Sequence, residues 1–139
     1  MSSMKKLVLL LLSTIFVAGC VSQTSTPIVN NTTTVSTEPT ITIISPTGGE
    51  TWNSGVSHTI SWTSQNVAHF QIWYSTVSSL RCDQEGWTLI QSHPYYLTSV
   101  DWTPRNINSN TIRIRVEGHN AAHRTIENAC SGEFSVTTQ

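Results

Sequence analysis

From residue 41 to the end of the chain, short segments place an apolar side chain at every second position. The clearest sets are Ile41 and Ile43; Ile60 and Trp62; Ala68, Phe70, Ile72 and Tyr74; Val100 and Trp102; Ile112, Ile114 and Val116; and Phe134 and Val136. Successive side chains of a β-strand point to opposite faces, so a period of two predicts half-buried strands. Turn residues separate the segments, as in Ser45-Pro46-Thr47-Gly48-Gly49. No window has the 3.6-residue period of a long amphipathic helix, and the predicted fold class is therefore all-β.

The number and spacing of these segments also predict an architecture. About seven or eight strands, starting roughly every ten residues, are typical of a two-sheet sandwich of the immunoglobulin or fibronectin III kind. We expect the domain to span 41–139, with Trp62 and Trp102 pointing inward as anchors of the core. In His93-Pro94-Tyr95-Tyr96, at the entry to one strand, the alternation predicts Tyr96 inside and Tyr95 outside.

The chain begins with a different kind of segment. Lys5-Lys6 precedes an apolar run from Leu7 to Ala18, and a charged region before a short apolar region is typical of a secretory signal peptide. The apolar run is shorter than the roughly 20 residues that a bilayer-spanning helix needs. Its end, Val17-Ala18-Gly19-Cys20, resembles the lipobox of prokaryotic lipoproteins. The resemblance implies that residues 1–19 are removed and that Cys20 carries a diacylglycerol.

Residues 20–40 connect the expected lipid to the expected domain. They are rich in Thr and Ser, contain no aromatic residue and sustain no period, which predicts a disordered tether. Two overlapping N-glycosylation sequons begin at Asn30 and Asn31, and whether the tether is glycosylated stays open.

Charge narrows the range of partners. The whole chain has seven basic and eight acidic residues and a net charge of −1. Loss of the signal peptide would remove the only two lysines and leave five scattered arginines. No basic patch for nucleic acid or for acidic lipids is visible, so we expect no nucleic-acid partner. The expected contact with the membrane is made through the N-terminal lipid.

One motif points to a family. The run Ser45-Pro46-Thr47-Gly48-Gly49-Glu50-Thr51-Trp52, followed by Ile60-Ser61-Trp62, resembles a recurrent extracellular module of the Kre9/Knh1-like, Ser-Thr-rich membrane-anchored family. Val100-Asp101-Trp102-Thr103-Pro104 and Gly132-Glu133-Phe134-Ser135-Val136 fit its later part. The resemblance implies an immunoglobulin-like domain on a cell surface, often as an accessory module. It carries over no catalytic residue.

Two further cysteines, Cys82 and Cys130, form an even pair in a chain that is expected to be exported. An oxidising compartment favours a disulfide between them. In a simple sandwich, however, their loops would lie toward opposite ends. The predicted loops 76–86 and 118–131 are long, so they could fold along the sheet edge and meet.

A ligand-binding candidate lies on the outward face of two strands that neighbour each other in such sandwiches. One strand contributes His69, Gln71 and Trp73, and the other contributes Arg113 and Arg115. An aromatic ring flanked by planar donors suits a sugar, which has apolar ring faces and a rim of hydroxyls. The alternative is ordinary surface packing, in which arginine stems cover an exposed tryptophan.

The sequence gives little support for a metal site, for catalysis or for a cofactor. His119 and His123 are four residues apart, a ligand-like spacing mainly on a helix, and no second motif completes a zinc site, so no metal is predicted. No serine-centred elbow, HExxH motif or glycine-rich phosphate loop is present. We therefore expect neither catalysis nor a cofactor.

These observations predict a lipoprotein anchored in a membrane through Cys20 and facing outside the cytoplasm. Its β-sandwich would be a non-catalytic module for cell-envelope interaction or adhesion. One alternative is a carbohydrate-binding module that recognises an envelope polysaccharide. Another is an inhibitor or assembly module that binds an envelope protein through the loops 76–86 and 118–131.

Overall fold

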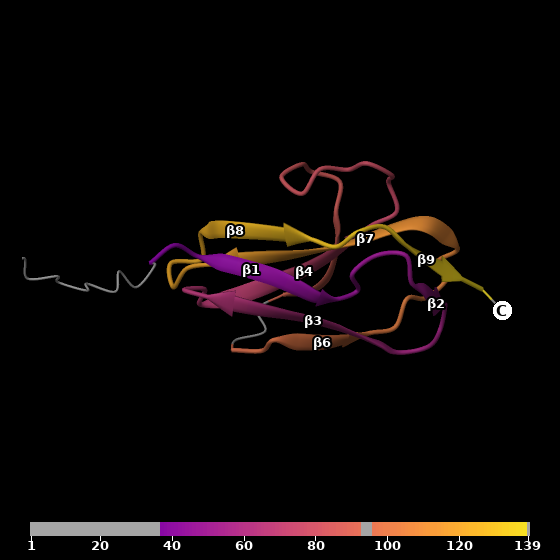
Figure 1. Ribbon diagram of the computed structural model, residues 1–139, viewed down its shortest axis with the longest axis horizontal. Coiled ribbons are helices and arrows are strands. Elements are labelled where there is room, and N and C mark those ends of the chain that lie inside the picture. Colours follow the sequence, from indigo (N-terminus) through magenta and orange to yellow (C-terminus); the bar gives the residue numbers. More distant parts are fainter. Residues whose placement is uncertain (1–36, 93–95, 139) are drawn as a thin grey trace, which may run out of the picture. The chain divides into compact units, whose positions relative to one another are not determined.

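A computed structural model describes residues 37–92 and 96–138 (Figure 1). These residues contain nine strands. The predicted signal peptide, Cys20, most of the tether and His93-Pro94-Tyr95 lie outside the described residues. The strands are β1 (Thr40–Ser45), β2 (Thr51–Asn53), β3 (His58–Gln65), β4 (His69–Ser75), β5 (Thr88–Ser92), β6 (Ser99–Trp102), β7 (Ser109–His119), β8 (Thr125–Cys130) and β9 (Phe134–Thr137). Among the described residues there is no helix with the length and apolar character needed to cross a membrane.

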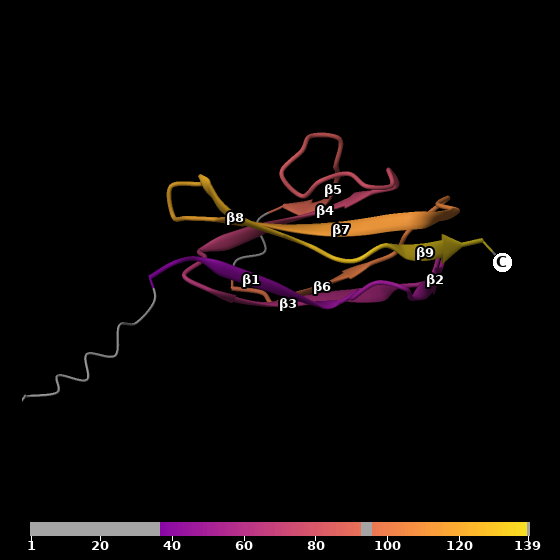
Figure 2. The ribbon, with the colours of Figure 1, turned by 45° about the horizontal axis from the view of Figure 1, so that its top comes forward.

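The strands form two sheets that face each other (Figure 2). The smaller sheet has the order β1-β3-β6, and the larger has the order β2-β9-β7-β4-β5. All pairs are antiparallel except β2 with β9, which run parallel. One edge of β7 pairs with β4, while its other edge is shared between β9 and β8. The predicted all-β sandwich is thus confirmed.

The core lies between the two sheets and contains the expected tryptophans. Trp62 is 2% exposed and Trp102 is 9% exposed. The ring of Trp62, on β3, packs edge-on against Phe70 of β4, with 5.2 Å between ring centroids. The other buried apolar side chains are Trp52, Ile60, Ile72, Val100, Ile112, Ile114, Val116, Phe134 and Val136. The period-two pattern therefore identified the inward faces of the main strands correctly.

The glycine-rich turn after β1 has a structural role. Gly48 has a φ of +121°, and a Cβ there would lie 2.9 Å from the Cα of Gly132. The Glu50 carboxylate accepts hydrogen bonds from the amides of Thr47 and Gly48, both at 2.7 Å, and from the Thr47 hydroxyl at 2.8 Å. The motif holds this turn against the segment that leads into β9, where the Gly49 amide donates to the Glu133 carbonyl.

Replacing Glu50 with glutamine tests this role. Burial tends to raise the pKa of Glu50, but the hydrogen bonds from Thr47 and Gly48 outweigh it and leave the pKa below the ordinary 4.5. A lowered carboxyl pKa contributes stability above the ordinary value and loses it as pH falls through the folded-state value. We expect Glu50→Gln to lower the free energy of unfolding by only about 1 kcal/mol at pH 7, since solvent screens this carboxylate. Near pH 3 the loss should be much smaller. Urea unfolding of both proteins at several pH values measures the difference; a pH-independent difference would contradict the assignment.

The prediction of a long loop over 118–131 is wrong for most of that segment. β7 continues to His119, a short turn follows, and β8 returns along β7 to Cys130. The side chain of Asn120 closes the turn by accepting hydrogen bonds from the amides of Ala122 and Arg124. No clear alternation marks β8, because its side chains are mostly half-buried on both faces. The conformation of β8 is therefore set by its pairing with β7, because β8 has no buried face of its own.

Tyr96 also departs from the prediction. Its side chain is 89% exposed, and its backbone has a φ of +57°. That left-handed conformation breaks the extended run, so the alternation of β6 does not reach back beyond Ser99. Tyr96 therefore lies on the surface instead of in the core.

Candidate functional site

Strands β4 and β7 are neighbours, as expected, and their register brings most of the candidate residues together. Trp73 pairs with Arg115, and Ser75 pairs with Arg113. Gln71 lies two positions along β4 from Trp73 on the same face, because side chains of a strand alternate. The four side chains Gln71, Trp73, Arg113 and Arg115 are all half-buried.

The loop between β4 and β5 covers much of this face (Figures 1 and 2). Arg113 donates from Nη1 to the Leu80 carbonyl at 2.6 Å and from Nε to the Ser131 carbonyl at 3.1 Å. Arg115 donates from Nη1 to the carbonyls of Cys82 and Gln84, both at 3.3 Å. Both arginines therefore bind the backbone of this cap, which we define as residues 76–87.

Arg115 is also enclosed by two aromatic rings. Its guanidinium lies 5.1 Å from the ring centroid of Trp73 and 5.2 Å from that of Trp87. Its side chain is 12% exposed and forms an ion pair with Glu117 at 3.0 Å. Burial lowers the pKa of Arg115, and the Glu117 carboxylate opposes this effect. Arg115 thus packs on tryptophan, as in the second of the two interpretations of this face, whereas Arg113 is held by backbone carbonyls.

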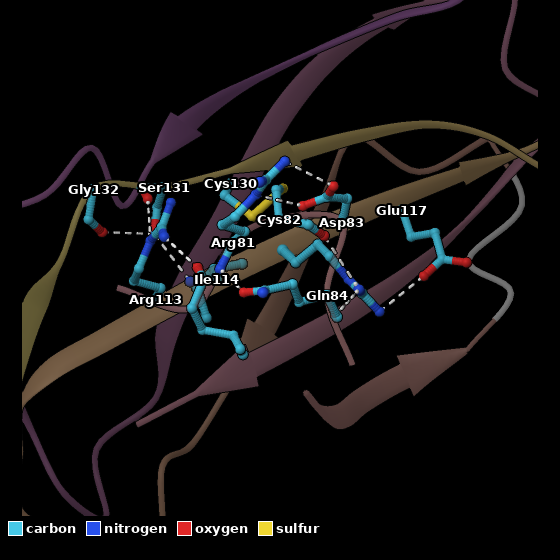
Figure 3. Close-up of a disulfide and its surroundings, with 12 residues drawn as sticks. Arg81, Cys82, Asp83, Gln84, Arg113, Ile114, Glu117, Cys130, Ser131 and Gly132 are labelled. Atoms are coloured by element: carbon cyan, nitrogen blue, oxygen red, sulfur yellow. Dashed lines mark hydrogen bonds and ion pairs between the residues drawn. A yellow bond between two sulfur atoms is a disulfide. The ribbon is translucent and has the colours of Figure 1, made fainter. Parts of the chain in front are cut away.

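The predicted disulfide is present and fastens the cap (Figure 3). Cys82 and Cys130 are bonded, with 5.8 Å between their Cα atoms. The two cysteines were expected toward opposite ends of the sandwich. They can meet because β8 pairs with β7, which places Cys130 opposite Arg115 near the middle of the sheet. The cap folds over the outward face to reach it. Two arginines and one covalent bond thus hold the same loop.

His69 is not on the outward surface, where the alternation placed it. It is 1% exposed, and its ring stacks on that of His119, with 5.2 Å between centroids and 2° between planes. The ring of His123, in the turn between β7 and β8, lies 4.4 Å from it. The hairpin that sequence analysis missed therefore buries His69. Among the described residues no group of three or more histidine, cysteine or acidic side chains is arranged to hold a metal ion.

A shallow cavity opens where the cap meets the sheet. Its volume is about 260 Å³, and its lining residues are Trp73, Asp83, Gln84, Glu85, Gly86, Trp87 and Arg115. Of these, only Trp73 and Arg115 belonged to the predicted site. Trp87 was not part of it, and residues 76–86 were predicted only to form a long loop. The one available signal was the cysteine at position 82, because a disulfide there requires the loop to fold back over the sheet.

Comparison with known proteins settles the fold. No protein-family model matches the chain, and no curated protein does. Among solved structures, the fibronectin(III)-like modules of Clostridium thermocellum CbhA match with a TM-score of 0.54 and 9% identity. The match covers 71% of this chain and 98% of that module. The domain has a fibronectin III-like fold.

The fibronectin III-like domain carries its candidate site on the outer face of the larger sheet. The cavity is bounded by side chains of β4 and β7 and by the cap, with Trp87 at the end of the cap. It contains aromatic rings, two carboxylates, an amide and a guanidinium, which is a set of groups suited to binding a polar ligand that has an apolar face.

Proposed function

We propose that this protein is a membrane-anchored lipoprotein whose fibronectin III-like domain is a non-catalytic binding module facing outside the cytoplasm. The lipobox-like sequence ending at Cys20 supports the anchor. The observation that carries the binding function is the cap, because a disulfide and two arginines hold it over a cavity lined by two tryptophans. A preorganised loop loses little conformational entropy on binding. The proposed role is contact with the cell envelope, including adhesion.

The chemistry of the cavity supports a binding role over catalysis. Its described lining contains no serine, cysteine or histidine, so the hydroxyl or thiol nucleophile with an imidazole base that is typical of acyl transfer is absent there. Asp83 accepts two hydrogen bonds from Arg81, at 3.2 Å and 3.1 Å. Glu117, behind Arg115, accepts from the Thr125 hydroxyl and pairs with Arg115. Most of the nearby carboxylates therefore have structural partners.

The alternative of a protein-binding or inhibitor module is supported best at the cap. Most of 118–131, its other proposed contact, is paired strand and not a loop. In the cap, Val77 is 54% exposed, and the Ser79 amide is fixed by the Glu133 carboxylate at 3.1 Å. A fixed loop with an exposed apolar side chain could also contact a protein, so a protein partner remains the second candidate.

The anchor is tested with Cys20→Ser in a bacterial host. We expect the wild-type chain to fractionate with membranes and to carry the added mass of a diacylglycerol on Cys20, whereas Cys20→Ser loses both properties. Ser13→Ala, which alters the signal but not the lipobox, should behave like the wild type. Mass spectrometry of the purified proteins measures the modification. An unmodified wild-type mass would contradict the anchor.

The binding role is tested with residues 35–139, which form a compact unit containing the whole described core. The oxidised domain should bind isolated cell envelopes saturably. The double variant Cys82→Ser/Cys130→Ser, which releases the cap, should bind less at a temperature where it is still folded. Equal binding by the two proteins would show that the cap is not the contact surface.

A further inference from the structure

We propose that the cavity beneath the cap binds a ring of an uncharged carbohydrate, with Trp87 and Trp73 as its apolar walls. The inference rests on the proposed binding function and specifies its ligand. Figure 3 shows Cys82, Asp83 and Gln84 around the disulfide. Asp83, Gln84 and Glu85 of the cap line the same cavity as the two tryptophans.

The aromatic walls are held rigidly. Arg115 contacts the rings of both Trp73 and Trp87 and is itself fixed by Glu117 and by two backbone carbonyls. Each tryptophan is half-buried, and both line the cavity beside the guanidinium that packs on their rings. A rigid indole presents a large amphipathic surface at low entropic cost, which suits the apolar face of a sugar ring.

The rim supplies hydrogen bonds of the kind that sugar hydroxyls need. Gln84 accepts from the Arg81 amide through its side-chain oxygen at 2.8 Å, which leaves its NH₂ group as a donor. Glu85 is exposed, and among the described residues its carboxylate makes no hydrogen bond or ion pair. Asp83 keeps acceptor capacity beyond its two bonds to Arg81. Hydroxyl groups donate and accept, so they match this mixed rim.

Charge gives little attraction for ionised ligands. The guanidinium of Arg115 is paired with Glu117, and the carboxylate of Asp83 is paired with Arg81. Recognition in the cavity would therefore rest on ring contact and hydrogen bonds, which suits a neutral ring. The volume of about 260 Å³ is near the lower limit for ligand pockets, roughly 300 Å³, so the cavity suits one terminal or branching ring of a larger glycan.

The experiment titrates the oxidised domain, residues 35–139, with neutral, anionic and cationic glycans on an array and then with the best neutral glycan by NMR. We expect the indole NH signals of Trp73 and Trp87 to shift. We expect Trp87→Ala to weaken binding at least tenfold and Glu85→Ala to weaken it several-fold. Tyr96→Ala, which removes an exposed aromatic ring outside the cavity, should leave the affinity unchanged. Because Glu85 is exposed and makes no hydrogen bond or ion pair among the described residues, its variant tests the site even where Trp87→Ala perturbs the cap.

Three outcomes would overturn the inference: no neutral glycan binds at millimolar concentration, only charged glycans bind, or both cavity variants bind as tightly as the wild type. Envelope binding separates this failure from failure of the proposed function. If the domain still binds envelopes and protease treatment of the envelopes abolishes that binding, the module recognises a protein. If it binds neither glycans nor envelopes, the binding function fails as well.

Discussion

Replacing Trp62 with alanine will destabilise the domain by about 3–5 kcal/mol, which is the usual cost of truncating a large buried aromatic side chain. Trp62 is 2% exposed and packs across the core from β3 onto Phe70 of β4. The substitution removes apolar contacts between the two sheets and leaves a cavity that the strands cannot close fully. Urea unfolding followed by circular dichroism gives the change in the free energy of unfolding.

Tyr96→Ala is the matched control for Trp62→Ala. It also truncates an aromatic side chain, but Tyr96 is 89% exposed, so the expected change lies within about 0.5 kcal/mol. A loss of less than about 1 kcal/mol for Trp62→Ala, comparable with the control, would mean that the two sheets do not share the tightly packed core described above.

Reduction of the disulfide will lower the stability of the oxidised domain by about 4 kcal/mol in the chain-entropy model. The bond joins residues 48 positions apart, Cys82 and Cys130, and so restricts a large part of the unfolded chain. It also fastens the cap, so we expect trypsin to cleave after Arg81 much faster in the reduced protein. Unfolding with and without reductant, and the rate of cleavage at Arg81, measure the two effects.

The double variant Cys82→Ser/Cys130→Ser is the control for the reductant. It should resemble the reduced wild type in stability and in cleavage rate, and reductant should not change it further. Two free thiols at these positions in the unreduced, denatured wild-type domain would contradict the disulfide. Equal cleavage rates in both redox states would show that Arg113 and Arg115 hold the cap without help from the bond.

The sequence allowed the layers of the fold to be predicted, because the inward faces of the main strands carry regular apolar positions. Ile112, Ile114 and Val116 on β7 are all 0% exposed, and the pairing of β7 with β4 follows from the expected sandwich. β8 could not be predicted in this way. Its side chains are half-buried on both faces, so no period distinguishes it from a loop, and only its partner β7 fixes its conformation.

The candidate site was predicted only in part, for a related reason. Alternation placed Trp73 and Arg115 on one face correctly, but it cannot show what covers that face. The cap adds Trp87 and the polar rim through contacts between residues far apart in sequence, such as Arg113 with Leu80. The prediction that His69 lies on the surface was wrong for the same reason. The hairpin of β7 and β8 covers its ring.

The way the cap is held has a consequence for sequence variation. Arg113 and Arg115 grip the cap through the main-chain carbonyls of Leu80, Cys82 and Gln84, and every residue type supplies a carbonyl. Cap positions whose side chains make no hydrogen bond or ion pair, such as the exposed Val77 and Glu85, can therefore be exchanged while the loop keeps its path. Such a loop is a natural scaffold for diversification: new specificities could be selected by varying these positions while the sandwich beneath is left untouched.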